Sequence, residues 1–116
     1  MREYSDTAVT KIVRVGLKNL QALAAGEIDG YLLNQFALDE YEGYLRAVTT
    51  VDTYRYRESE DGKGHYSYET LEDSSSNFLY VLDQDLNVVG GIRDLAEGER
   101  VYSVRFDGEV GYFVTF

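Results

Sequence analysis

Two parts of this chain carry the same succession of strand-like segments, and this repeat limits the folds that the sequence can adopt. Residues 11–15 (KIVRV) match residues 78–82 (FLYVL), and residues 31–36 (YLLNQF) match residues 101–106 (VYSVRF). The separation is roughly 66 to 70 residues, of which about 25 form a polar stretch between the two parts. Each repeated part is therefore about 40 residues long, which is enough for four short antiparallel strands.

The repeat divides the chain into two β units joined by a polar segment. We predict one all-β domain over residues 1–116, with a first unit at 7–56, a polar insertion loop at 57–76 and a second unit at 77–116. The insertion contains many acids, two glycines and three consecutive serines, so it has little apolar surface to bury. Valine, isoleucine, threonine and tyrosine dominate the flanking strands, as is typical of pleated surfaces. The remaining strands are predicted at residues 7–17, 30–36, 44–51, 86–92 and 111–116, with a turn-rich acidic stretch at 38–43.

One segment gives conflicting signals. Leu17, Leu20 and Leu23 recur every third residue, which taken alone favours a short helix that ends at Gly26. In the register of the repeat, however, residues 20–23 align with the strand-like residues at 86–89. We therefore predict a strand over residues 20–25.

Composition excludes several classes of function. The net charge is −10, from 21 acids against 11 bases, so the surface repels nucleic acid and anionic membranes. No apolar run approaches the roughly 20 residues that cross a bilayer. The chain has no cysteine, which excludes disulfides and thiolate metal sites. The first six residues lack the apolar core of a signal peptide, so we expect none in this chain.

Long stretches of the sequence are similar to one known family. Residues 30–50 resemble secreted bacterial and archaeal proteins whose C-terminal region is a β-propeller distantly related to WD-type repeats. Residues 77–83, 101–106 and 112–116 resemble the segments that follow in the same family. The similarity covers most of the chain apart from residues 57–76. These motifs mark structure rather than chemistry.

The resemblance implies a fold and a location. The fold is all-β, with antiparallel blade-like sheets that form part of a β-propeller, and the location is extracellular or at the cell surface. The resemblance implies no reaction. A closed propeller needs at least about four blades, whereas residues 7–56 and 77–116 supply two blade-like units. Because two isolated blades expose surfaces that neighbours would cover, we expect a homodimer through exposed sheet faces or edges, an exchange of strands, or face-to-face packing of the two sheets.

The sharpest local motif is a candidate calcium loop. Asp83, Asp85 and Asn87 alternate, and Asp94 stands at the twelfth position of the motif. Such oxygen ligands can wrap a cation, but Val88 occupies the position that needs glycine, and Asp94 replaces the usual glutamate. The simpler interpretation is a polar turn, so we assign no metal-binding residue.

Other polar residues indicate no catalytic site. A triad or dyad that uses histidine would require His65, the one histidine, which lies among glycines in the polar segment. Gly90-Gly91 precedes no phosphate-binding motif. The acidic pairs stand in turns without a predicted cleft; they are Asp39 with Glu40 and Glu42, Glu58 with Glu60, and Glu97 with Glu99. Four alternating tyrosines could stack sugars, hold a peptide or simply pack across strands; they are Tyr54, Tyr56, Tyr66 and Tyr68.

We therefore predict a non-catalytic extracellular scaffold or interaction module with a protein or glycan partner, no cofactor, no nucleic-acid ligand and no membrane insertion. The alternative is a segment of a secreted hydrolase whose catalytic residues lie outside residues 1–116. A weaker alternative is an adhesion domain stabilised by a cation.

Overall fold

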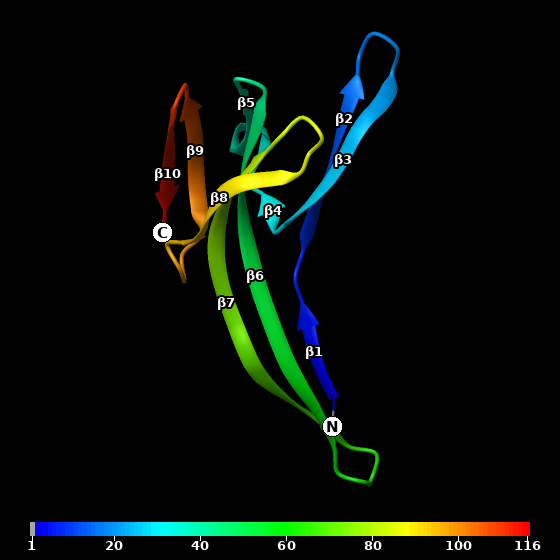
Figure 1. Ribbon diagram of the computed structural model, residues 1–116. Coiled ribbons are helices and arrows are strands. Elements are labelled where there is room, and N and C mark those ends of the chain that lie inside the picture. Colours follow the sequence, from blue (N-terminus) through cyan, green and yellow to red (C-terminus); the bar gives the residue numbers. More distant parts are fainter. Residues whose placement is uncertain (1) are drawn as a thin grey trace.

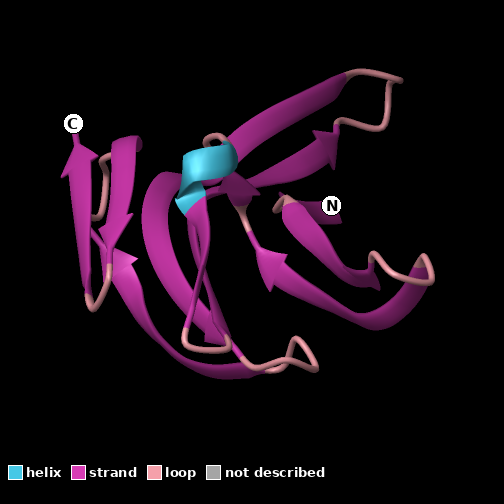
Figure 2. Ribbon diagram, turned by 90° about the horizontal axis from the view of Figure 1, so that it is seen from above, coloured by secondary structure: helices cyan, strands magenta, loops and turns pink. Residues whose placement is uncertain are grey.

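The computed structural model describes residues 2–116, which form antiparallel strands and one short 3-10 helix (Figures 1 and 2). In chain order the elements are β1 (Arg2–Asp6), β2 (Val9–Gly16), β3 (Gln21–Asp29), β4 (Tyr31–Leu32), η1 (Gln35–Ala37), β5 (Leu38–Tyr41), β6 (Tyr44–Glu60), β7 (Tyr66–Leu82), β8 (Val88–Leu95), β9 (Val101–Asp107) and β10 (Val110–Thr115).

The central sheet is built around β6 and β7. These two strands pair along their whole length, from Leu45↔Leu82 to Glu60↔Tyr66. At one end β5 pairs with β6 and β8 pairs with β7, which gives a four-stranded meander in the order β5–β6–β7–β8. The two-residue strand β4 adds to β6 next to β5.

Two separate hairpins cover the two faces of this meander. β2 pairs with β3, and β9 pairs with β10. The β2–β3 hairpin packs Ile12 and Ile28 against Ala47, Tyr80 and Leu82. The β9–β10 hairpin packs on the other face, where Val101, Val104 and Phe113 contact Val48 and Leu79 of the meander. Because successive residues of a strand point to opposite faces, Ala47 lies in the first core and Val48 in the second. The sheet is therefore a middle layer between two hairpins.

The far halves of β6 and β7 leave this core and project as an arm (Figure 1). There β1 pairs with β6 over Arg2↔Glu58 to Asp6↔Tyr54, so the arm has three strands. A turn at residues 61–65 closes its tip. The arm contributes to the elongated shape of the molecule, 62 × 35 × 21 Å.

The structure confirms the strand that the repeat predicts over residues 20–25, because β3 begins at Gln21. Leu20 and Leu86 occupy matching places before the second strand of their hairpins, and both have a positive φ, 56° and 62°. The threefold spacing of leucines that favours a helix thus falls on a β-turn and a strand. The predicted all-β, antiparallel fold class is also confirmed.

Two predicted elements near the middle of the chain are wrong. Only Tyr31–Leu32 of the expected strand 30–36 pairs as a strand, because Asn34 accepts a hydrogen bond from the Phe36 backbone and caps η1. The acidic stretch 38–43, expected to be irregular, contains β5. Arg46 lies opposite Asp39 and bonds to its carboxylate, which offsets the acidic character of this edge strand.

The predicted polar insertion loop at 57–76 is also wrong. β6 continues to Glu60 and β7 begins at Tyr66, so nearly all of this segment is paired strand. Cross-strand ion pairs and tyrosine contacts stabilise it in place of a core. The pairing of β6 with β7 also joins residues of the expected units 7–56 and 77–116 in one sheet.

Gly30 makes the sharp entry into β4, and its replacement tests how closely the segments pack. Its φ is +91°, and a Cβ there would lie 2.5 Å from the Thr50 carbonyl oxygen. Gly98 has a similar φ of +80° but open space around it. We expect Gly30→Ala to lower the free energy of unfolding in urea by about 3 kcal/mol and Gly98→Ala by about 1 kcal/mol. Equal losses would show that backbone strain acts alone.

Candidate functional site

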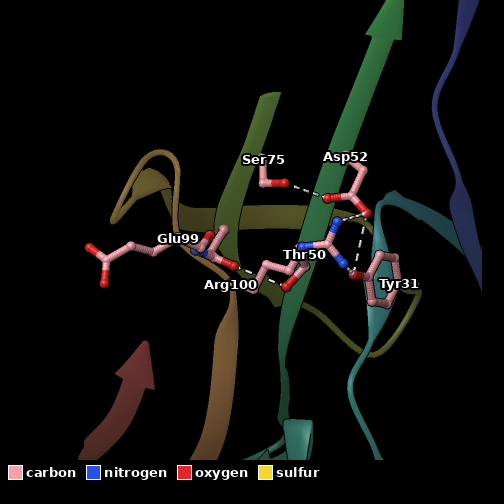
Figure 3. Close-up of polar contacts among 7 residues, drawn as sticks. Tyr31, Thr50, Asp52, Ser75, Glu99 and Arg100 are labelled. Carbon is pink, nitrogen blue, oxygen red and sulfur yellow. Dashed lines mark hydrogen bonds and ion pairs between the residues drawn. The ribbon is translucent and has the colours of Figure 1, made fainter. Parts of the chain in front are cut away.

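A polar cluster joins four segments where the arm leaves the meander (Figure 3). The Asp52 carboxylate accepts hydrogen bonds from Ser75 Oγ at 2.7 Å and from the Tyr31 hydroxyl at 3.4 Å. Arg100 forms an ion pair with Asp52 at 3.2 Å and donates to the Tyr31 hydroxyl. Partial burial raises the pKa of Tyr31, and the negative charge of Asp52 adds to this shift. The side chains of Asp52 and Arg100 remain substantially exposed.

Asn77 lies beside this cluster and is fully buried. Its amide oxygen accepts from Thr50 Oγ1 at 2.9 Å, and its amide nitrogen donates to the carbonyl oxygens of Leu95 and Glu99, each at 2.9 Å. These bonds hold the connection between β8 and β9 against the sheet. The cluster thus positions the β9–β10 hairpin, and we assign it a structural role.

The arm provides a different kind of surface. Alternation on β6 places Tyr54 and Tyr56 on one face, and Tyr4 lies opposite Tyr56 in the register. The Tyr4 and Tyr56 rings are stacked with centroids 5.0 Å apart, and the Tyr54 and Tyr68 rings lie 5.4 and 6.1 Å from that of Tyr56. We call these four residues the tyrosine face. Tyr68 is 66% exposed, so the rings form an open aromatic surface.

Carboxylates border the tyrosine face towards the tip. The Tyr4 hydroxyl donates to Glu58 at 3.0 Å. The negative charge of Glu58 raises the pKa of the Tyr68 hydroxyl above its ordinary value. Beyond these rings lies a hollow of about 300 Å³ lined by Arg2, Glu58, Glu60 and Tyr66. The hollow adjoins the aromatic surface and has two carboxylates in its wall.

The opposite face of the arm carries ion pairs. Arg57 contacts Glu3 at 3.1 Å and Glu69 at 3.6 Å, and these residues come from the two strands that flank β6. Arg55 lies 3.9 Å from Glu72. The alternation Tyr-Arg-Tyr-Arg in residues 54–57 therefore sorts aromatic and charged side chains onto opposite sides. The arginines of the charged side pair with the acids around them, whereas on the tyrosine side Glu58 accepts a hydrogen bond from Tyr4 and shares the hollow with Glu60 and Arg2.

The residues of the candidate calcium loop form a turn. The Asp83 carboxylate accepts from the backbone nitrogens of Asp85 and Asn87, at 2.9 and 3.0 Å. Asp94 accepts from Ser76 Oγ at 3.1 Å. Within residues 2–116, no group of three or more acidic, histidine or cysteine side chains is arranged to hold a metal ion. The structure thus accounts for Asp83 as the residue that caps its turn.

The other polar candidates lie apart from one another. His65 sits at the tip of the arm, where its ring contacts Asp61 at 3.0 Å and its side chain is 79% exposed. A backbone hydrogen bond from Lys63 lowers the pKa of Asp61. The Asp39 carboxylate binds Arg46, whereas Glu58 borders the tyrosine face. Gly91 allows β8 to pack, because a Cβ there would lie 2.3 Å from the Leu79 carbonyl oxygen.

Sequence reasoning found most of the tyrosine face but missed part of it. Tyr54, Tyr56 and Tyr68 stand in the predicted alternation, and Tyr66 lines the adjoining hollow. Tyr4 was missed because it comes from β1, about 50 residues away in sequence. The signal that could have found it is the alternation Arg-Glu-Tyr at residues 2–4, which complements Tyr-Arg-Glu at 56–58 in antiparallel order.

A four-stranded antiparallel meander between two packed hairpins defines a module built from stacked, blade-like sheets. The sequence profile of the beta propeller domain family matches residues 1–116, and the chain belongs to this family. It is 41% identical over 113 residues to an uncharacterized protein of Methanocaldococcus jannaschii, and 43% identical over 107 residues to one of Archaeoglobus fulgidus.

These alignments cover 97% and 92% of the chain but only 16% and 14% of the two relatives. The chain thus spans about one sixth of the length of the curated relatives that it matches. No solved structure matches the chain. Among residues 2–116, the helix present falls short of the length and apolarity that a membrane crossing requires.

Proposed function

We propose that this chain is a non-catalytic interaction module of an extracellular β-propeller related to the WD type. The tyrosine face carries the proposal. Tyrosine offers a large rigid ring and a polar tip, and it is enriched in surfaces that bind other proteins. Here four tyrosines lie together on an arm that projects away from the core. The location rests on the resemblance to exported proteins.

The chemistry beside the rings supports a polypeptide partner with basic side chains. Glu58 and Glu60 lie next to the aromatic surface and line the hollow with one arginine, Arg2, so acids outnumber bases there. The chain carries a net charge of −10, which attracts cations over a distance. Lysine and arginine stack well on tyrosine rings and pair with carboxylates. An extended basic segment can use both interactions at once along this face of the arm.

A peptide-binding measurement tests this proposal. The probe is a fluorescein-labelled dodecapeptide of alternating arginine and threonine, titrated with the protein and followed by fluorescence anisotropy. We expect saturable binding that Tyr56→Ser weakens at least about tenfold, because the central ring of the tyrosine face is lost. The matched control is Arg55→Gln, the neighbouring residue on the opposite face, which should leave the affinity within about twofold.

Two results would overturn the proposal. One is equal weakening by both variants, since general electrostatic attraction would then explain the binding. The other is no saturable binding of the peptide together with saturable binding of cellohexaose, a β-linked glucose oligomer. That outcome would assign the tyrosine face to glycans. Far-ultraviolet circular dichroism of each variant checks that the strands remain folded.

A further inference from the structure

The two outer hairpins correspond to the two halves of the central meander. β2–β3 matches β7–β8: both hairpins have a register shift late in their first strand, between Arg14 and Val15 and between Val81 and Leu82. Both also have a leucine with positive φ in the turn. β9–β10 matches β5–β6, since each is an antiparallel pair closed by two residues, with Asp107 opposite Val110 and Tyr41 opposite Tyr44.

The burial of side chains agrees with this correspondence. Ile12 of β2 faces the meander as Leu79 of β7 faces the β9–β10 hairpin. Likewise Phe113 of β10 packs onto the meander, as Ala47 of β6 packs onto the β2–β3 hairpin. Each outer hairpin thus packs against its neighbouring sheet with the same face as the matching half of the meander. The chain holds one complete four-stranded sheet, preceded by the last half of such a sheet and followed by the first half of another.

Both half sheets expose apolar side chains on the strands that would meet. On β2, Val13 is 57% and Val15 is 44% exposed. On β10, Tyr112 is 59% and Val114 is 53% exposed. In the complete sheet the counterparts of these two strands, β7 and β6, are paired with each other. Edges with unpaired backbone groups and apolar side chains are templates for a further strand.

We propose that β10 of one molecule pairs antiparallel with β2 of a second copy of this chain. The β9–β10 hairpin and the second copy's β2–β3 hairpin then form a composite sheet that repeats β5–β6–β7–β8. The known pairing of β6 with β7 sets the register. Ala47↔Tyr80 corresponds to Phe113↔Val13, and Arg46↔Val81 corresponds to Tyr112↔Arg14. In the complete sheet the small Ala47 lies opposite the large Tyr80. In the composite sheet the large Phe113 lies opposite the smaller Val13, so the two pairs fill similar space. Tyr112 also gains a cation for its ring.

The association is head to tail, because β10 and β2 are different surfaces. Such contacts form a ring when the rotation closes and a filament when it does not. Each copy contributes one complete sheet and two halves, which adds two sheets per molecule. Known propellers contain about four to eight blades, which corresponds to a ring of two to four copies. The inference concerns the sheet edges and is independent of what the tyrosine face binds.

Disulfide trapping tests the register directly, since the chain contains no cysteine of its own. Equal amounts of Tyr112→Cys and Arg14→Cys proteins are mixed and oxidised, and the cross-linked product is quantified on a non-reducing gel. The control mixture combines Arg14→Cys with Val110→Cys, which lies two residues away on the same face of β10. We expect at least about tenfold more cross-linked product from the first mixture, because the control pair lies about 7 Å out of register.

Light scattering after gel filtration tests the assembly itself. We expect the unmodified chain to give a defined multiple of its 13.2 kDa mass. Val114→Lys places a charge opposite Ile12, on the face of the composite sheet that packs against the second copy's meander, and should give a monomer with unchanged circular dichroism. The proposal would be overturned if the unmodified chain were a monomer at millimolar concentration. Equal cross-linking in both mixtures, or an assembly that persists in Val114→Lys, would overturn it as well.

Discussion

Replacing Asn77 by alanine is expected to lower the free energy of unfolding by about 3 to 5 kcal/mol. The variant removes all the side-chain hydrogen bonds of a fully buried residue, so Thr50 Oγ1 and the carbonyl groups of Leu95 and Glu99 lose the Asn77 amide as a partner. A buried polar group without a partner costs about 1 to 3 kcal/mol. Urea denaturation followed by tyrosine fluorescence measures the loss.

The neighbouring Ser76→Ala serves as the matched control. Ser76 points to the other face of β7, where its hydroxyl contacts Asp94 at an exposed site. Its removal should change stability by less than about 0.5 kcal/mol. If Asn77→Ala loses no more than Ser76→Ala, then the Asn77 amide does not hold the connection between β8 and β9.

Leu82→Ala is expected to cost about 3 to 5 kcal/mol. Leu82 is 0% exposed and packs among Ile28, Ala47 and Leu86, at the point where the β2–β3 hairpin meets the central sheet. Removal of its side chain leaves a cavity as well as lost apolar contact. The same urea titration gives the difference in free energy.

Val88→Ala is the control for Leu82→Ala. Val88 is the strand partner of Leu82, but it is 52% exposed. We expect a loss below about 1 kcal/mol, because the Val88 side chain buries little apolar surface that the substitution could remove. Similar losses from the two variants would mean that the core between β2–β3 and the central sheet is not a major source of stability.

Most strands of the meander and of the two hairpins were predictable from sequence, because their apolar residues alternate or form continuous runs. The repeat also resolved the leucine-rich segment, because it aligned residues 20–23 with residues 86–89. The structure agrees, since Leu20 and Leu86 have the same turn conformation. The boundaries of the sheets were not predictable in this way. Four strands per unit can be grouped from any starting strand, and only the observed pairing of β6 with β7 shows where the complete sheet begins and ends.

The arm was missed for a different physical reason. Burial is the main signal of a strand in sequence, and residues 57–76 have almost nothing to bury. Their pairing depends on partners across the sheet, such as Glu3 and Glu69 beside Arg57. Likewise the contact of Asp52 with Arg100 joins residues 48 positions apart. Contacts of this kind have no local pattern.

The continuation of β6 and β7 from the core into the arm has a consequence for the arm. A sheet that packs against no core on either side specifies its alignment weakly, because a slip by one residue moves no apolar side chain out of a core. The arm does not have to choose its own alignment, since Ala47 and Leu82 anchor the same two strands in the interior. A single register shift, between Arg55 and Tyr56, then sets how the outer half follows. The buried end of β6 and β7 thus fixes the register of the arm, and with it the face on which each side chain of the arm lies.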